Sequence, residues 1–185
     1  MTEQEVQQIV VVPFDPDWSR QFERERGIVS EALGPALAAV EHTGSTAIPN
    51  QAAKPIIDMF AAVRPFAEAS VYADKLSPAG YSYVETGMEG RYLFAKKRGG
   101  VRTGHLHILP LEGFYERNEL LFRDYLRAHP DFVRQYGELK QRLAEQFPSD
   151  GEQYTRAKTA FIQQVVDLAR QEKGLPWQNV WESQV

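Results

Sequence analysis

The stretch from His42 to Phe60, HTGSTAIPNQAAKPIIDMF, places polar groups that suit phosphate binding inside an otherwise apolar run. The Gly44-Ser45-Thr46 sequence predicts a turn whose backbone N–H groups point outward, and a following helical turn would direct its positive end the same way. Lys54 adds a positive charge to the segment. These features together predict a phosphate site. The alternative is that the Gly-Ser pair only reverses the chain, which is its commoner role.

Asp58 is the second candidate for chemistry, because it interrupts the apolar sequence PIIDMF. In a strand, Ile56, Asp58 and Phe60 would share one face. A carboxylate in such a setting is costly to bury without a partner. Asp58 is therefore a candidate catalytic group or metal ligand. The alternative is an aspartate at the end of a strand, exposed at the rim of the sheet or capping a loop.

Two histidines alternate in the sequence GHLHILP. On a strand, His105 and His107 would share one face, with Leu106 and Ile108 on the other. Two imidazoles on one face suit a metal ion, a phosphate or a contact with Asp58 across the sheet. Two histidines with ordinary hydrogen-bond partners are the equally weighted alternative.

Two tyrosine–lysine pairs repeat a spacing of four residues. Tyr136 and Lys140 share the face of one predicted helix, and Tyr154 and Lys158 share the face of the next. Together they predict a cationic and phenolic wall facing the polar groups of the sheet, which Arg123 would join. The alternative is that each lysine extends its ammonium to solvent and that Arg123 forms an ion pair between helices.

These residues need a small sheet and a helical layer to position them. Alternation and turn residues predict strands at residues 7–14, 38–42, 56–63, 81–85, 92–97 and 102–109. Apolar periodicity and the positions of proline and glycine predict helices at residues 16–33, 65–80, 130–147 and 152–172. The strands at 92–97 and 102–109 would form a hairpin through RGG. The predicted class is α+β, with an N-terminal helix, a small mixed sheet and a C-terminal helical layer.

Composition narrows the class of protein. A chain of 185 residues that is 43% hydrophobic can bury one sizeable core, so one domain over residues 1–185 is expected. No cysteine is present, which excludes disulfides and thiolate metal sites. No apolar run is long enough to span a membrane and the N-terminus does not resemble a signal peptide, so a cytoplasmic protein is expected. The net charge of −4 gives no general attraction for nucleic acid.

A known family shares several of these motifs in the same order. The sequences EHTGSTAIPNQAAKPIIDMFAAV, HLHIL, FRDYLRAHP, YGELK and YTRAKTAFI resemble the GrpB-like family of bacterial proteins, which is placed in the nucleotidyltransferase superfamily. The resemblance extends from FDPDWSRQFERE to AFIQQVVDLAR and implies a nucleotidyltransferase-like fold. Asn50 and Gln51 depart from the family pattern, which resembles Gly-Leu at these positions. That departure affects the flexibility of the loop.

The resemblance also implies roles for individual residues. Gly44 and Ser45 match the turn that holds nucleotide phosphates in the superfamily, and Asp58 matches the first carboxylate of its Asp-x-Asp or Asp-x-Glu metal-binding pair. Phe60 stands at the position of the second carboxylate. A third acidic residue is expected on a neighbouring strand, where this sequence offers His105 or His107. The usual two-metal arrangement is therefore incomplete.

Three functions follow as hypotheses. The first is a nucleotidyltransferase-like protein that binds a nucleoside triphosphate and a divalent metal, Mg or Mn, held by Asp58 and His107. The second, favoured by Phe60, is a module that binds a nucleotide or another phosphorylated small molecule without turnover. The third is a metal-dependent hydrolase built on Asp58, His105 and His107, for which Mn, Fe or Zn would suit the mixed ligands better. The positive charges of the sequence KKRGGVR are expected to face solvent at an edge of the sheet, so nucleic acid is not an expected partner.

Overall fold

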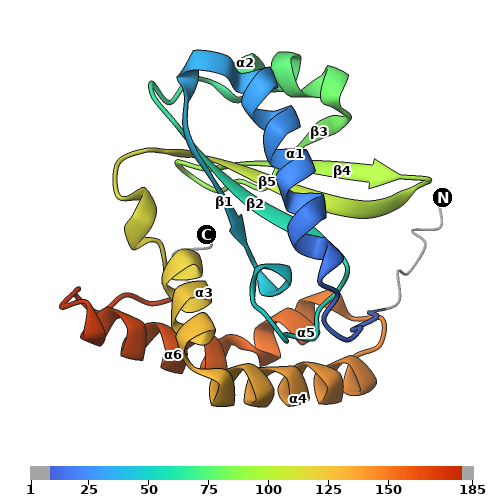
Figure 1. The fold of residues 1–185 in the computed structure, drawn as a ribbon, viewed down its shortest axis with the longest axis vertical. Coiled ribbons are helices and arrows are strands. Elements are labelled where there is room, and N and C mark those ends of the chain that lie inside the picture. The colour runs from blue at the N-terminus through green and yellow to red at the C-terminus, as the bar shows by residue number, and fades with distance from the viewer. Residues whose placement is uncertain (1–8, 181–185) are drawn as a thin grey trace.

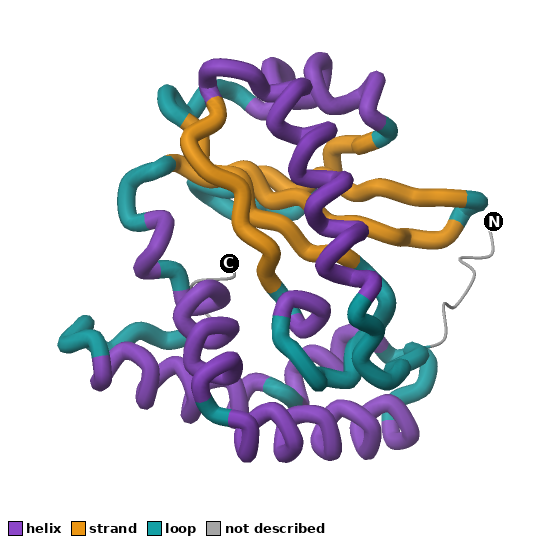
Figure 2. Tube along the Cα trace, viewed as in Figure 1, coloured by secondary structure: helices purple, strands orange, loops and turns teal. Residues whose placement is uncertain are grey.

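A five-stranded mixed sheet forms the centre of the fold, with helices on both sides (Figures 1 and 2). The computed structural model describes residues 9–180. The strands are β1 (Leu37–Thr43), β2 (Ile57–Val63), β3 (Tyr81–Val84), β4 (Tyr92–Arg98) and β5 (Val101–Pro110). The α-helices are α1 (Asp17–Leu33), α2 (Ala69–Leu76), α3 (Asn118–Ala128), α4 (Pro130–Gln146), α5 (Gly151–Ala157) and α6 (Thr159–Glu172). This arrangement confirms the predicted α+β class.

The sheet has the order β1-β2-β5-β4-β3, and β2 and β5 are parallel neighbours. The remaining neighbouring strands are antiparallel. β4 and β5 form the predicted hairpin through Gly99 and Gly100, both with positive φ. The parallel pairing matters most for function, because it brings together two strands that are far apart in the sequence.

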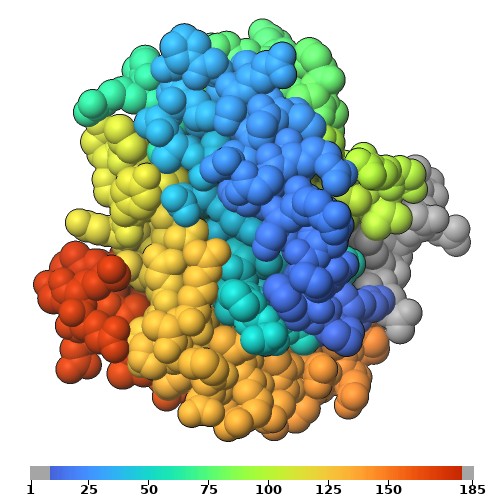
Figure 3. Space-filling view, in the orientation of Figure 1, coloured from blue at the N-terminus to red at the C-terminus, as the bar shows by residue number. Residues whose placement is uncertain are grey.

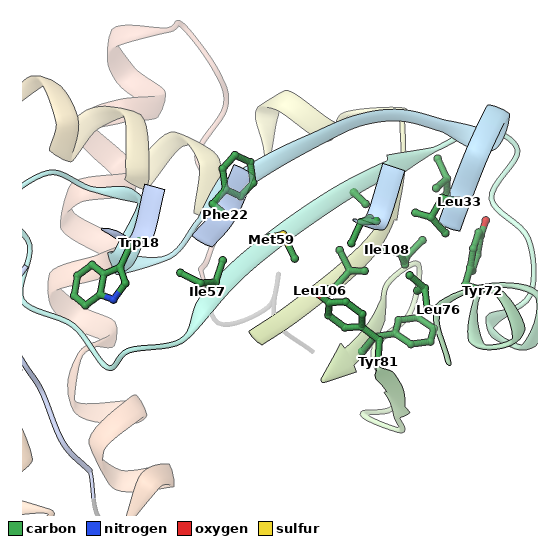
Figure 4. Close-up of a cluster of buried hydrophobic side chains, with 14 of the residues drawn as sticks. Trp18, Phe22, Leu33, Ile57, Met59, Tyr72, Leu76, Tyr81, Leu106 and Ile108 are labelled. Atoms are coloured by element: carbon green, nitrogen blue, oxygen red, sulfur yellow. The ribbon is translucent and has the colours of Figure 1, made fainter. Parts of the chain in front are cut away.

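One face of the sheet carries the main hydrophobic core (Figure 4). Met59 on β2 and Leu106 and Ile108 on β5 have no exposed surface. They pack with Phe22 and Leu33 of α1, which repeat at helical spacing along the buried side of that helix. The predicted helix at residues 16–33 is confirmed, and it ends at a glycine with φ 59°. This core holds β2 and β5 in place for the opposite face.

The opposite face carries the polar residues that the sequence singled out. Thr43 on β1 lies opposite Asp58 on β2, and Asp58 lies opposite His105 on β5. Phe60 lies opposite His107 in the same register. Because side chains at every second position share a face, these five residues point toward the same side of the sheet.

Helices α3 to α6 form a second layer with its own hydrophobic cluster. In the space-filling view, the blue α1 region covers the sheet and the orange α4 region lies beneath it (Figure 3). Along α4, Tyr136, Lys140 and Leu143 are buried, which confirms that this predicted helix has a buried face. None of the helices among residues 9–180 is long and apolar enough to cross a membrane.

Three predicted elements differ from the structure. Within residues 7–14, the described part forms no named strand, but Val12 makes an isolated bridge to Ala53; residues 7 and 8 lie outside the described range. The helix predicted at 65–80 is reduced to α2 and a 3-10 turn, Ser77–Ala79, that contains a proline. The helix predicted at 152–172 is divided at Lys158 into α5 and α6. Apolar periodicity continues across that division, so the sequence does not reveal it.

Candidate functional site

A cavity of about 190 Å³ lies between the polar face of the sheet and helices α3, α4 and α6. One end is formed by Thr43, Gly44, Ser45 and Asp58. The other contains Arg91 and the start of α3. The complete lining is Thr43, Gly44, Ser45, Asp58, Phe60, Arg91, His107, Asn118, Glu119, Phe122, Tyr136, Ile162 and Val180.

The Gly-Ser turn is shaped by the approach of Asp58. Gly44 has φ 68°, and a Cβ at this position would overlap the Asp58 carboxylate. Only glycine therefore fits without strain. A single 3-10 turn, Ser45–Ala47, follows it in place of a longer helix. Ser45 and Gly44 face the cavity, whereas the Thr46 hydroxyl donates to the Ile56 carbonyl at 3.2 Å and holds the turn against the start of β2.

Asp58 and His105 form a hydrogen-bonded pair. Asp58 Oδ1 lies 2.8 Å from His105 Nδ1, and both side chains are partly exposed. Arg102 Nη1 lies 3.4 Å from His105 Nε2. With the proton of a neutral imidazole on Nδ1, Nε2 is the acceptor. A carboxylate that fixes a histidine in this tautomer prepares it to accept a proton from a nearby hydroxyl.

His107 has a different partner from the one expected. Its Nδ1 accepts a hydrogen bond from Arg91 Nε at 2.9 Å. Burial and then the Arg91 charge hold the pKa of His107 well below its usual value, so the ring is neutral and carries its proton on Nε2. Arg91 in turn pairs with Glu119 at 2.6 Å and lies over the Phe60 ring. The structure thus brings Asp58 together with His105, and places His107 in a separate polar cluster.

Three lysines gather around the turn and the two tyrosines. Lys140 Nζ donates to Ser45 Oγ at 2.8 Å and to the Ala52 carbonyl. Lys140 is only 3% exposed, which excludes extension to solvent. Lys158 Nζ lies 4.4 Å from the centre of the Tyr154 ring, and Lys54 Nζ lies 5.3 Å from it.

The lysine cluster is short of negative charge. Burial, with the nearby Lys158 and Lys54 ammonium groups, lowers the pKa of Lys140 to about 6. Burial and Lys54 also lower the pKa of Lys158 to about 8, although Asp58 opposes that shift. The pKa of Lys54 is lowered mainly by desolvation of its ammonium, again against the attraction of Asp58. An added anion would relieve the repulsion among these groups.

Arg123 connects two elements and does not line the cavity. Its Nη1 donates to Glu41 Oε2 and to the His42 carbonyl, both at 2.7 Å, and its Nε donates to Asp124 at 2.7 Å. The guanidinium therefore ties β1 to α3. Its ion pair with Glu41 joins a helix to a strand, and not two helices as the sequence predicted.

Several cavity residues were not identified from the sequence. Thr43 Oγ1 is buried and, among residues 9–180, has no hydrogen-bond partner. Thr43 and Glu41 are two positions apart on β1 and therefore share a face of the sheet. This spacing could have identified Thr43 as a residue of the polar face. Arg91 lies in the loop before β4, and Glu119 in the first turn of α3, so no periodic pattern marked either of them.

The side chains available as ligands determine which metal ion the site could hold. Among residues 9–180, no group of three or more His, Asp or Glu side chains is placed to hold an ion. Asp58 is engaged with His105, and His107 is engaged with Arg91. Mg is often held by one or two carboxylates together with the phosphates of a substrate. Asp58 supplies one carboxylate of such a set, and the side chains among residues 9–180 do not by themselves complete a metal site.

Similar proteins agree with this fold. UPF0157 protein YqkA from Bacillus subtilis is 37% identical over 166 residues, covering 89% of this chain and 48% of YqkA. This chain thus spans about half the length of that relative. The crystal structure of conserved protein GrpB from Enterococcus faecalis superposes with a TM-score of 0.82 at 35% identity, covering 89% of this chain and 99% of that one.

A more distant structure shares the fold alone. Terminal uridylyl transferase 4 from Trypanosoma brucei with bound dUTP gives a TM-score of 0.53 at 15% identity, covering 94% of this chain and 60% of that one. The fold is therefore nucleotidyltransferase-like. Residues 8–168 match the family described as GrpB protein. On that match, the chain belongs to the GrpB family.

Proposed function

We propose that this protein binds a nucleoside triphosphate and transfers its nucleotidyl group to an acceptor hydroxyl. The observation that carries the proposal is the lysine cluster beside the Gly-Ser turn. Lys140 is bonded to Ser45, while Lys158 and Lys54 lie close enough to Asp58 for its charge to oppose the lowering of their pKa values by burial. Two amines near Asp58 and a third at the Gly-Ser turn suit a polyphosphate anion.

Asp58 lines this end of the cavity, and its hydrogen-bond partner His105 is a group that can accept a proton. In the proposed transfer, the acceptor oxygen bonds to the α-phosphorus, the bond from that phosphorus to the β-phosphate oxygen breaks, and pyrophosphate leaves. His105 Nε2 takes the hydroxyl proton while Asp58 holds Nδ1–H. An Mg or Mn ion bound with the nucleotide would supply charge neutralisation at the phosphates.

Ligand-dependent thermal stability tests the binding step. Tripolyphosphate and each nucleoside triphosphate, with and without Mg, are expected to raise the melting temperature of the protein. Lys140→Met should abolish these shifts, and the unliganded variant should melt no earlier than the wild type, because Met keeps the apolar stem. Lys173→Met, at an exposed site at the end of α6, is the matched control and should retain the shifts. Equal shifts in all three proteins would refute the lysine site.

A second candidate function is binding without transfer. Phe60 favours it, since its ring is 2% exposed and lies under the Arg91 guanidinium, where a second metal-binding carboxylate would otherwise stand. Release of pyrophosphate from bound triphosphates, measured with a panel of hydroxyl-bearing small molecules, separates the two functions. Triphosphate binding with no pyrophosphate release from any member of the panel would favour the binding module.

A further inference from the structure

The lysine cluster does not line the cavity itself but adjoins its Ser45 end, because Lys140 donates to Ser45 Oγ. The other end of the cavity has no role in the proposed function. Beyond Asp58, the cavity continues over Phe60 to His107 and Glu119. Arg91 brings a positive charge to this inner end, but Glu119 lies 2.6 Å from it and balances that charge. An anion therefore has a better site near Lys140, and the inner end suits an uncharged group.

The inner end offers hydrogen-bonding groups of both kinds. His107 is neutral, with Nδ1 occupied by Arg91, so Nε2–H is a donor in a residue that lines the cavity. Glu119 gives Oε1 to Arg91, and a carboxylate has further acceptor capacity. These two groups match a ligand that carries both an acceptor and a donor along one edge.

The buried hydroxyl of Thr43 is a separate indication that the cavity holds a ligand. Thr43 is 2% exposed, lines the cavity, and its Oγ1 has no hydrogen-bond partner in the described part of the chain. A buried hydroxyl without a partner costs about 1–3 kcal/mol, so buried polar groups normally have one. A ligand in the cavity would supply the partner that the protein does not.

The remaining walls are aromatic. Phe60 packs edge-on against His107 at 5.3 Å, and Phe122 packs edge-on against Tyr136 at 5.2 Å. Flat apolar walls with polar groups at their edges favour a flat ring over a sugar or an aliphatic chain.

We propose that the cavity binds an uncharged heteroaromatic ring with hydrogen-bond donors and acceptors on its edge, of the nucleobase type. The ring extends from His107 and Glu119 at the inner end, over Phe60, toward Thr43 beside Asp58, and Thr43 Oγ1 is bonded to it. The ring belongs either to the triphosphate itself or to a separate acceptor. The assignment of its source rests on the proposed function, whereas the presence of the ring site does not.

Calorimetric titration with uridine, cytidine, adenosine and guanosine tests the ring site. At least one nucleoside should bind, and Thr43→Val should weaken its binding about three- to tenfold, the range for loss of one hydrogen bond. Thr43→Ser keeps the hydroxyl and should retain the affinity. Thr43→Val should be no less stable than the wild type, because the hydroxyl it removes has no partner within the described residues. Wild-type affinity in Thr43→Val, or the binding of tripolyphosphate without any nucleoside, would overturn the proposal.

Competition experiments identify the source of the ring. If the ring is part of the triphosphate, the nucleoside and the triphosphate exclude each other, whereas a ring on the acceptor allows both to bind at once. Nucleoside binding without tripolyphosphate binding would retain the ring site and refute the lysine phosphate site. The two proposals therefore fail separately.

Discussion

At the scale of single residues, Lys140 is the most unusual group in the protein. It is buried at the turn, with Ser45 and Ala52 as hydrogen-bond acceptors and two other lysines nearby. A neutral amine has two N–H donors for these two acceptors. The proposed phosphate ligand would favour the charged form, so binding should be accompanied by proton uptake near neutral pH.

The stability of the protein should depend on pH through Lys140. Its pKa falls from the usual 10.5 to about 6 in the folded state. Between those values the unfolded chain binds more protons, so the free energy of unfolding should rise with pH across this window. Below about pH 6 the full cost of the buried charge is present. The lowered pKa of Lys158 likewise makes the free energy of unfolding rise with pH.

Urea denaturation of the wild type and Lys140→Met checks this expectation. The variant should be more stable, with the largest advantage near pH 6 and a smaller one near pH 9, within the window set by Lys140. Asp58, Lys54 and Lys158 are present in both proteins, so the two proteins differ only in the side chain at position 140. An advantage that stays constant with pH would contradict the assignment.

A substitution of His105 should distinguish triphosphate binding from the transfer step. In the proposed transfer His105 touches the acceptor hydroxyl but does not hold the phosphates. His105→Gln should therefore lower the transfer rate about 10²- to 10⁴-fold, the usual contribution of a general base, and leave triphosphate affinity nearly unchanged. Initial rates of pyrophosphate release and calorimetric affinities provide both values. A parallel loss of rate and affinity would show that His105 serves binding instead.

At the scale of elements, the turn after β1 depends on one missing side chain. Gly44→Ala would place a methyl group against the Asp58 carboxylate at a φ of 68°. Backbone strain alone should cost about 1–3 kcal/mol. Gly27→Ala in α1 is the matched control: it meets no atom within 4 Å and should stabilise the helix by about 0.5–1 kcal/mol. Thermal denaturation measures both, and equal effects would contradict this account of the turn.

The elements were largely predictable from the sequence, whereas their pairing was not. Alternation located β2 and β5, and each placed its polar side chains on one face. The sequence did not specify that these strands are parallel neighbours or that Asp58 lies opposite His105 in place of His107. The register between two strands depends on packing across the whole core. The predicted strand at residues 7–14 shows the same limit, because only Val12 pairs there, in an isolated bridge to Ala53.

Side-chain partners were the least predictable feature of the site. Lys140 was identified from its spacing, because it follows Tyr136 by four residues on the buried face of α4. Arg123 was also named as a candidate, yet its partner Glu41 is 82 residues away along the chain. Arg91 gave no signal at all. Partners chosen by tertiary contact are not encoded in local periodicity.

At the scale of the whole molecule, polar contacts tie the sheet to the helical layer around the cavity. Arg123 joins α3 to Glu41 and the His42 carbonyl, and Arg127 donates to the Ala47 carbonyl at 2.9 Å. Lys140 makes the corresponding contact from α4. The main core on the sheet and the hydrophobic cluster of the helical layer are separate clusters.

Breaking the Arg123 contacts should affect stability more than binding. Arg123→Leu leaves Glu41 and the His42 carbonyl without their charged donor and should cost about 2–3 kcal/mol. Triphosphate affinity, measured where the variant is fully folded, should stay within about twofold, since hydrogen-bond loss at a ligand typically exceeds that change. Denaturation and calorimetry report the two quantities. A large loss of affinity with unchanged stability would instead place Arg123 in the phosphate site.

Val180 gives the cavity a wall from outside the part of the chain that matches the family. The matched region is residues 8–168, and every other lining residue falls within it. Val180 is 3% exposed, and its backbone N–H donates to Gln163 of α6 at 2.9 Å. The shape of this wall is therefore set by a segment that the family match does not include. Replacing that segment would change the cavity at Val180 and leave the matched residues 8–168 intact.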